Sequence, residues 1–97
     1  MTTQRAKEPL FVLGQIVATP GALNALKDAE QWPGEFLVRH VYGDWGDLDR
    51  EDKAANDAAL KEDTRIFSAY HTTKQVKIWV ITEWDRSATT LLLPDEY

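Results

Sequence analysis

Carboxylates are densest in the stretch from Asp44 to Asp52, where five of the nine residues are acidic. Clustered carboxylate oxygens are the ligands that hard cations such as Ca²⁺ prefer. The stretch nevertheless lacks the Asp-x-Asp-x-Asp-Gly spacing and the later bidentate glutamate of a calcium loop. Acidic residues also favour the first turn of a helix, where they cap amide groups and meet the positive end of the helix dipole. We therefore expect a helix start here, with no metal and no cofactor.

General acid–base chemistry near neutral pH would fall to the two histidines, His40 and His71. His40 shares an apolar face, at helical spacing, with Phe36 and Leu37, and this favours a buried structural role. His71 ends a run that is typical of a strand, and we expect it to be structural or solvated. The chain has no cysteine, which excludes thiolate nucleophiles, thiolate metal sites and disulfides. No serine stands in a Gly-x-Ser-x-Gly turn, so these residues favour a protein without catalysis.

Recognition of a partner is the chemistry that the tryptophans suggest. Trp32, Trp45 and Trp84 lie in loops or polar turns, where an indole ring brings a large contact area at a small entropic cost. In a domain of 97 residues the same rings can instead cover the edge of the core, and the sequence leaves both readings open. Arg86, near Trp84, could add a bidentate contact to a carboxylate. We predict a partner-binding surface made of Trp45, Asp47, Trp84 and Arg86.

The net charge of −5 arises from one segment of the sequence. Residues 44–63 hold eight acidic and three basic side chains, and the rest of the chain is balanced. An acidic protein is a poor ligand for nucleic acid, because binding phosphates requires basic side chains that displace counterions. No run approaches the ~18 apolar residues of a membrane span, and no apolar leader follows Met1. We expect a cytoplasmic protein with a protein partner or a homo-oligomer, and no direct contact with nucleic acid or membrane.

The clearest elements that could position these residues lie in the last third of the chain. Residues 65–71, 77–83 and 88–93 are rich in β-branched and aromatic side chains, which is typical of strands. The connections between them are short enough for hairpins, so the three runs predict an antiparallel meander. Alternation along each strand should divide the side chains between core and surface, with Trp79 or its neighbours facing the helices.

The first two thirds of the chain predict one strand and two to three short helices. Leu10–Ala18 is typical of a strand that contains Gly14 and could pair parallel with one strand of the meander. Thr19 and Pro20 indicate the start of a helix. Helices are expected over residues 20–29, 34–42 and 49–63, and an alanine stripe in the third should let it lie close against the sheet. The fold class is therefore α+β, with helices on one face of the sheet, in a single domain of residues 1–97 whose residues 1–9 are flexible.

Several stretches carry a resemblance to a known family: Gly14–Leu23, Gly43–Leu48, Ser68–Tyr70, Ile81–Thr90 and Leu92–Tyr97. Together they resemble small bacterial proteins usually called plasmid-related, over nearly the whole chain. The resemblance implies the company of plasmids and other mobile elements, but no activity that can be assigned to individual residues. Some members are labelled as a type I restriction methylation subunit. This chain has no Asn-Pro-Pro-Tyr-like motif and is too short to hold a cofactor domain as well.

The leading interpretation is a small, acidic, non-enzymatic binding or regulatory protein of plasmid or mobile-element origin, acting through a protein partner or self-association. One alternative is a toxin-type ribonuclease, because the order of elements is loosely similar to that of the ParE and RelE toxins. Those proteins generally carry several basic residues on the sheet, whereas the supply here is thin. The other alternative is an acidic mimic of DNA that blocks restriction enzymes, although −5 over 97 residues is a weak charge for a mimic.

Overall fold

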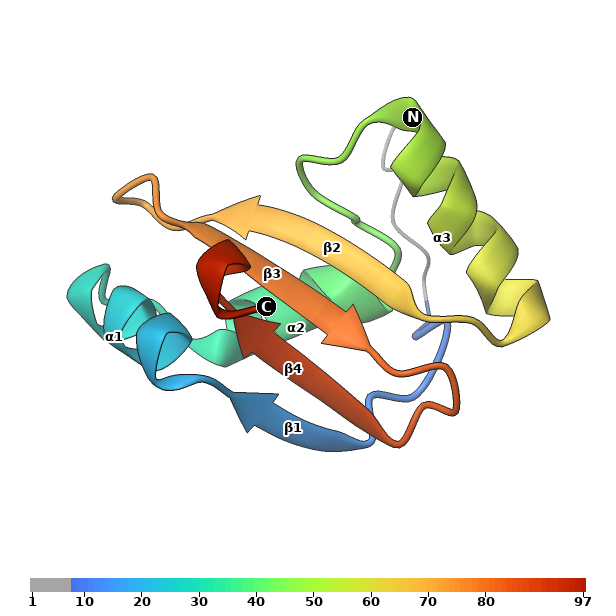
Figure 1. Cartoon of the computed structure of the whole chain (residues 1–97), viewed down its shortest axis with the longest axis horizontal. Helices are drawn as coiled ribbons and strands as arrows, with labels where there is room; N and C mark the ends of the chain where they lie inside the picture. Colours follow the sequence, from blue (N-terminus) through green and yellow to red (C-terminus); the bar gives the residue numbers. More distant parts are fainter. Residues whose placement is uncertain (1–7) are drawn as a thin grey trace.

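The structure is a computed structural model and describes residues 8–97. One strand, three α-helices, three further strands and a terminal 3-10 turn follow one another along the chain (Figure 1). Their bounds are β1 Gln15–Ala18, α1 Pro20–Asp28, α2 Pro33–Val41, α3 Arg50–Glu62, β2 Ile66–His71, β3 Lys77–Thr82, β4 Ala88–Leu92 and η1 Pro94–Glu96. The α+β class is confirmed. Most of the segment expected to be flexible, residues 1–7, lies outside the described residues.

The four strands form one mixed sheet in the order β1-β4-β3-β2. β2, β3 and β4 are antiparallel neighbours, but the sheet is larger than the predicted three-stranded meander. β1 adds a fourth strand, parallel to β4, with Ile16 opposite Thr89 and Ala18 opposite Leu91. Parallel pairing of the amino-terminal strand, which the sequence suggested, is thus observed. In residues 8–97 no helix is long and apolar enough to cross a membrane.

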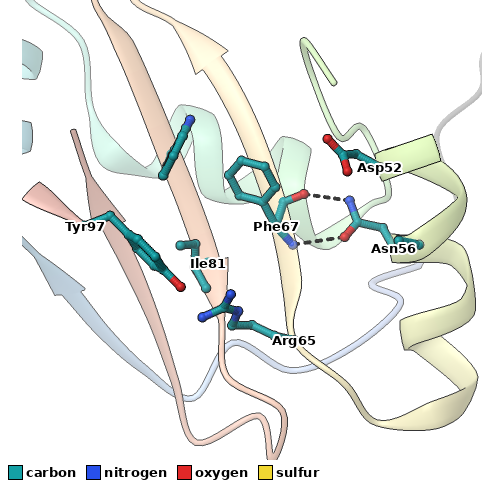
Figure 2. Close-up of a pocket in the computed structure, with 8 residues that line it drawn as sticks. Asp52, Asn56, Arg65, Phe67, Ile81 and Tyr97 are labelled. Atoms are coloured by element: carbon teal, nitrogen blue, oxygen red, sulfur yellow. Dashed lines mark hydrogen bonds between the residues drawn. The ribbon is translucent and has the colours of Figure 1, made fainter. Parts of the chain in front are cut away.

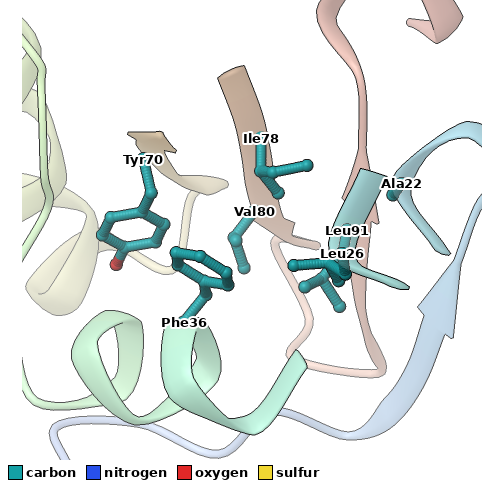
Figure 3. Packing of buried hydrophobic residues seen from close by; sticks show 7 residues of the cluster. All are labelled: Ala22, Leu26, Phe36, Tyr70, Ile78, Val80 and Leu91. Carbon is teal, nitrogen blue, oxygen red and sulfur yellow. The ribbon is translucent and has the colours of Figure 1, made fainter. Parts of the chain in front are cut away.

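The main core lies between one face of the sheet and the helices α1 and α2 (Figure 3). Ile78 and Val80 point to this face from β3 and meet Leu26 of α1 and Phe36 of α2, all of them nearly or fully buried. Each such side chain contributes about 1.5–3 kcal/mol when it leaves water. Trp79, between the two β3 residues, points to the opposite face as strand alternation requires. Its neighbours, and not Trp79 itself, therefore face the helices.

Local capping explains where the helices begin. The Thr19 hydroxyl accepts the Ala22 amide at 3.2 Å, and Pro20 occupies the first helical position. The Asp49 carboxylate accepts the Asp52 amide at 2.8 Å at the start of α3. These side chains satisfy amides that have no partner inside the helix. The sequence signals for both helix starts are confirmed.

The position of α3 differs from the prediction. It does not lie on a face of the sheet but runs beside the edge strand β2 (Figure 1), with most of its alanine stripe exposed. The Asn56 amide explains this position: its Nδ2 donates to the Phe67 carbonyl at 2.6 Å, and its Oδ1 accepts the Phe67 amide at 3.0 Å. The helix is thus attached to strand backbone. The predicted arrangement, with helices on one face of the sheet, therefore holds for α1 and α2 alone. The opposite face of the sheet keeps an open region.

The first half of the expected strand Leu10–Ala18 is also not a strand. Gly14 adopts φ 67°, and a Cβ built on it would lie 2.3 Å from the Ser87 carbonyl oxygen. Only glycine fits this close approach with a left-handed backbone. The chain before Gly14 therefore leaves the sheet, and the Leu10 amide donates to the carbonyl of Val41 at the end of α2 (2.8 Å).

Candidate binding site

Trp45, predicted to contact a partner, lies inside the protein. Only 6% of it is exposed, and its ring packs against those of Phe11 and His40, at centroid distances of 6.4 and 6.0 Å. Its indole nitrogen donates to Asp57 at 3.2 Å. The Ala69 amide donates to the Trp45 carbonyl at 3.1 Å, so the turn also pairs with β2. The prediction is corrected: Trp45 covers the edge of the core and presents no surface to a partner.

Arg86 is held by its own domain. Its Nη1 donates to the Thr64 carbonyl at 2.7 Å and its Nη2 to the Ala59 carbonyl at 2.9 Å, and Nη1 also contacts the carbonyls of Glu83 and Trp84. The Ala59 carbonyl belongs to the last turn of α3, where carbonyls lack helical partners and the dipole favours a cation. Arg86 therefore fastens the β3–β4 turn to α3. A guanidinium engaged in this way is not a free anchor for a partner's carboxylate.

The other two predicted residues are exposed but lie far apart. Trp84 is 63% exposed in the turn that follows β3. Asp47 accepts a hydrogen bond from Nδ1 of His71 at 2.6 Å, and His71 pairs with Lys77 at the beginning of β3. The whole length of β3 thus separates Asp47 from Trp84. The four predicted residues form no common surface, and a contact role for Trp84 or Asp47 stays a prediction.

The acidic stretch is occupied by structural contacts. Asp44 accepts from Arg39 Nε at 2.7 Å, and this hydrogen bond raises the pKa of Arg39 above its ordinary value. The Tyr70 hydroxyl donates to the Asp44 carbonyl at 2.6 Å, and Asp49 caps α3. Among residues 8–97 no group of three or more histidine or acidic side chains is placed to hold a metal ion.

His40 has a neighbour that the sequence did not suggest. Its Nδ1 lies 2.6 Å from Ser68 Oγ and its Nε2 lies 2.9 Å from Thr82 Oγ1, a spacing that resembles a serine–histidine catalytic pair. All three side chains have no exposed surface, so no substrate can reach the serine. Burial lowers the pKa of His40 to about 3. His40 is therefore a neutral core residue.

Hydrogen-bond counting assigns the tautomer of His40. The Thr89 hydroxyl donates to the Leu13 carbonyl at 2.8 Å, so its oxygen must accept from Thr82, 2.7 Å away. Thr82 has then used its proton and accepts from Nε2–H of His40. The neutral ring has one acceptor left, Nδ1, which accepts from Ser68. In this arrangement each of the four side chains donates one proton to the next acceptor, and none is left without a partner. The hydrogen bonds join α2 to the strands β2, β3 and β4.

An open pocket lies on the sheet face opposite α1 and α2 (Figure 2). We call it the aromatic pocket; its volume is about 350 Å³. It is lined by Asp52, Ala55, Asn56, Arg65, Phe67, Trp79, Ile81 and Tyr97. The rings of Phe67 and Trp79 meet edge to face at 5.0 Å, and Trp79 meets Tyr97 in the same way at 5.8 Å. Strands β2 and β3 thus supply an aromatic floor, with α3 on one side and the carboxyl terminus on the other.

Two charged side chains border the aromatic pocket. The Arg65 guanidinium lies 5.5 Å from the centre of the Tyr97 ring, within cation–π range, and Arg65 is exposed. Asp52 borders the pocket from the first turn of α3. Asn56 contributes little further polarity, because its amide is committed to the Phe67 backbone. The arrangement can accept an apolar group against the rings, with one cation and one anion available at the rim.

Sequence reasoning missed this pocket, although part of the signal was present. Phe67, Trp79 and Ile81 occupy alternate strand positions, so a shared face was predictable. The sequence did not indicate that α3 would leave this face open, nor that Tyr97 would return to it.

The chain matches no protein-family model, no curated protein and no solved structure. The resemblance to plasmid-related proteins stays a prediction.

Proposed function

We propose that the chain is a small non-enzymatic protein-binding module whose contact surface is the open face of the sheet, centred on the aromatic pocket. The observation that carries this proposal is the pocket itself: an aromatic floor on the sheet face that α1 and α2 leave uncovered. The proposal includes a regulatory role in the cytoplasm. The family resemblance adds an origin on a plasmid or another mobile element.

Exposed aromatic area favours a partner. Tyr97 is 67% exposed, and Phe67 and Trp79 are only partly buried, although both lie inside strands. Large apolar side chains gathered in one hollow are typical of contact sites, where they bring area at low entropic cost. A volume of about 350 Å³ suits one or two apolar side chains of a partner. Trp84 follows the end of β3 that lies nearest Arg65, because Ile66 pairs with Thr82, and it can extend the same surface.

Charge indicates the chemistry of the partner. The helix α3, which forms one wall of the aromatic pocket, holds four acidic and three basic side chains, and Asp52 is the acidic one that lines the pocket. A partner that inserts an apolar side chain and places a basic side chain beside Asp52 would be complementary to this wall, and the net charge of −5 would speed the association of a basic partner. Arg65 stands on the other border, where a carboxylate of the partner could bind.

The alternative functions receive less support from the same observations. A ribonuclease needs several cations that face a substrate, whereas Arg86 donates to backbone carbonyls and the lining of the pocket pairs one cation, Arg65, with one anion, Asp52. The mimic needs carboxylates in a regular outward row. Here Asp44 bonds to Arg39, Asp49 caps a helix and Asp57 accepts from Trp45, so several carboxylates are engaged by the protein's own groups.

The test compares tagged baits in host extract, followed by affinity measurement with the purified captured protein. Arg65→Glu and Tyr97→Ser alter the pocket, and Trp32→Ser is the matched control because Trp32 is 76% exposed elsewhere. We expect both pocket variants to weaken binding by about tenfold or more, the scale of a contact hot spot, while Trp32→Ser binds normally. A partner bound equally by all baits, or lost only with Trp32→Ser, would overturn the proposal. RNA cleavage by the purified wild-type chain would favour the alternative function, a toxin-type ribonuclease.

A further inference from the structure

The outer edge of β1 is open in the part of the chain that the structure describes. β1 is the last strand of the sheet on its side, with β4 as its neighbour. The Gln15 amide donates to Ser87 at 2.9 Å and the Thr19 amide to Leu91 at 3.0 Å, both toward β4. Because backbone groups alternate along a strand, the amides and carbonyls of Ile16 and Ala18 point away from β4. Such an edge can receive another strand.

The opposite edge of the sheet is closed. On β2 the Phe67 amide and carbonyl bond to Asn56, as described above. The next outward residue, Ala69, bonds to the Trp45 carbonyl and accepts the Asp47 amide at 2.6 Å. The chain thus blocks β2 with a side chain and a loop, two of the usual protections against edge pairing. No described residue protects β1 in this way.

The surroundings of the open edge suit a second copy of the chain. No charged residue occurs from Pro9 to Leu26, in a protein whose net charge is −5. One charge from elsewhere in the chain lies at the end of β1, where the Glu96 carboxylate accepts from the Thr19 hydroxyl and from the Gly21 amide at 3.0 Å. Two like-charged molecules meet with least repulsion through a surface that carries few charges, and this carboxylate is already engaged by hydrogen bonds within its own chain. Ile16 and Val17 are 44% and 41% exposed on opposite faces of β1, and a strand from a second copy would cover part of both side chains. A basic partner, which the acidic segment would attract, finds no other complementary charge here.

We propose that two copies pair antiparallel through their β1 edges. With Ile16 of each copy opposite Ala18 of the other, four backbone hydrogen bonds form and Val17 faces its own equivalent on the twofold axis. The axis stands perpendicular to the sheet, so one continuous sheet runs through both copies. The pairing uses a surface separate from the aromatic pocket and goes beyond the proposed binding function.

Sedimentation across a concentration series tests the pairing. We expect the wild-type chain to reach twice its mass of 11.0 kDa at high concentration and to dissociate on dilution. Ile16→Lys should stay at 11.0 kDa with unchanged circular dichroism, since an edge lysine blocks strand pairing. Val38→Lys is the matched control, because Val38 is 48% exposed on α2. A wild-type chain that stays monomeric up to about 1 mM, or a folded Ile16→Lys dimer, overturns the proposal.

A cross-link locates the axis without relying on a destabilising change. The chain has no cysteine, so Val17→Cys adds one thiol, which the proposed register brings within disulfide range of its equivalent. We expect rapid oxidation to a covalent dimer, and none for Val38→Cys or for Val17→Cys combined with Ile16→Lys. Should Ile16→Lys unfold, hydrogen exchange of the wild type decides: the Ile16 and Ala18 amides must exchange at least about tenfold more slowly at high than at low concentration. Equal exchange overturns the pairing.

Discussion

Acid should destabilise the protein through His40 in particular. The ring is fully buried, and its Nδ1 accepts from Ser68 while its Nε2–H donates to Thr82. A second proton would convert the acceptor Nδ1 into a donor facing a hydroxyl and would place a charge in the core. Both effects oppose protonation in the folded state, and burial accordingly lowers the pKa of His40 from 6.5 to about 3.

The size of the effect follows from the two pKa values. In the unfolded chain the ring takes up a proton below pH 6.5, whereas in the folded chain it stays neutral down to about pH 3. Between these values the unfolded state binds more protons, so the free energy of unfolding falls as the pH falls. The slope is about 1.4 kcal/mol per pH unit, which gives a loss of about 2–3 kcal/mol between pH 7 and pH 4.5.

Urea unfolding of the wild type and of His40→Leu from pH 7 to pH 4.5 measures this loss. The variant has no titratable group at this position, while the carboxylates that both proteins share affect the two curves alike. The wild type should be the more stable at pH 7, and its advantage should shrink by about 2–3 kcal/mol at pH 4.5. An advantage that is constant with pH would refute the reasoning. If His40→Leu does not fold, the His40 ring resonance in a His71→Gln background must stay unchanged from pH 7 to pH 5.

Three further changes test how the elements are joined, each by its effect on the urea midpoint. Arg86→Lys should lower the free energy of unfolding by about 2 kcal/mol, because a single ammonium cannot replace a guanidinium spread over several carbonyls; an unchanged midpoint contradicts this. Gly14→Ala should lower it by about 2–4 kcal/mol through its left-handed backbone and the clash with Ser87, and a neutral result would mean that the β1 start shifts freely. Asn56→Leu should cost about 2–3 kcal/mol by leaving the β2 edge unpaired, whereas Ala58→Leu on the exposed side of α3 should be nearly neutral.

Signals confined to neighbouring residues were readable in the sequence. Thr19 before Pro20 and Asp49 before an acidic turn each accept an amide three positions further on, so type and spacing suffice to place the helix starts. The same holds for strand alternation, which separates Ile78 and Val80 from Trp79 without knowledge of the rest of the fold.

Contacts between distant segments were not readable. Trp45 looks exposed in a polar turn until Phe11 and His40, from two other segments, cover it. Arg86 looks free until its turn meets the end of α3. In both cases the local sequence gives the residue type but not its surroundings, and these surroundings decide between a contact residue and a structural one.

The open face and the open edge have a common physical origin in α3. Because Asn56 attaches this helix to the backbone of β2, α3 closes that edge and leaves the aromatic pocket uncovered beside it. β1, at the far side of the sheet, receives no such cover from residues 8–97. Pairing of two copies about an axis perpendicular to the sheet would set both aromatic pockets on the same side of one continuous surface. A partner with two apolar anchors would then bind its second site at a high effective concentration, gaining avidity with no new contact.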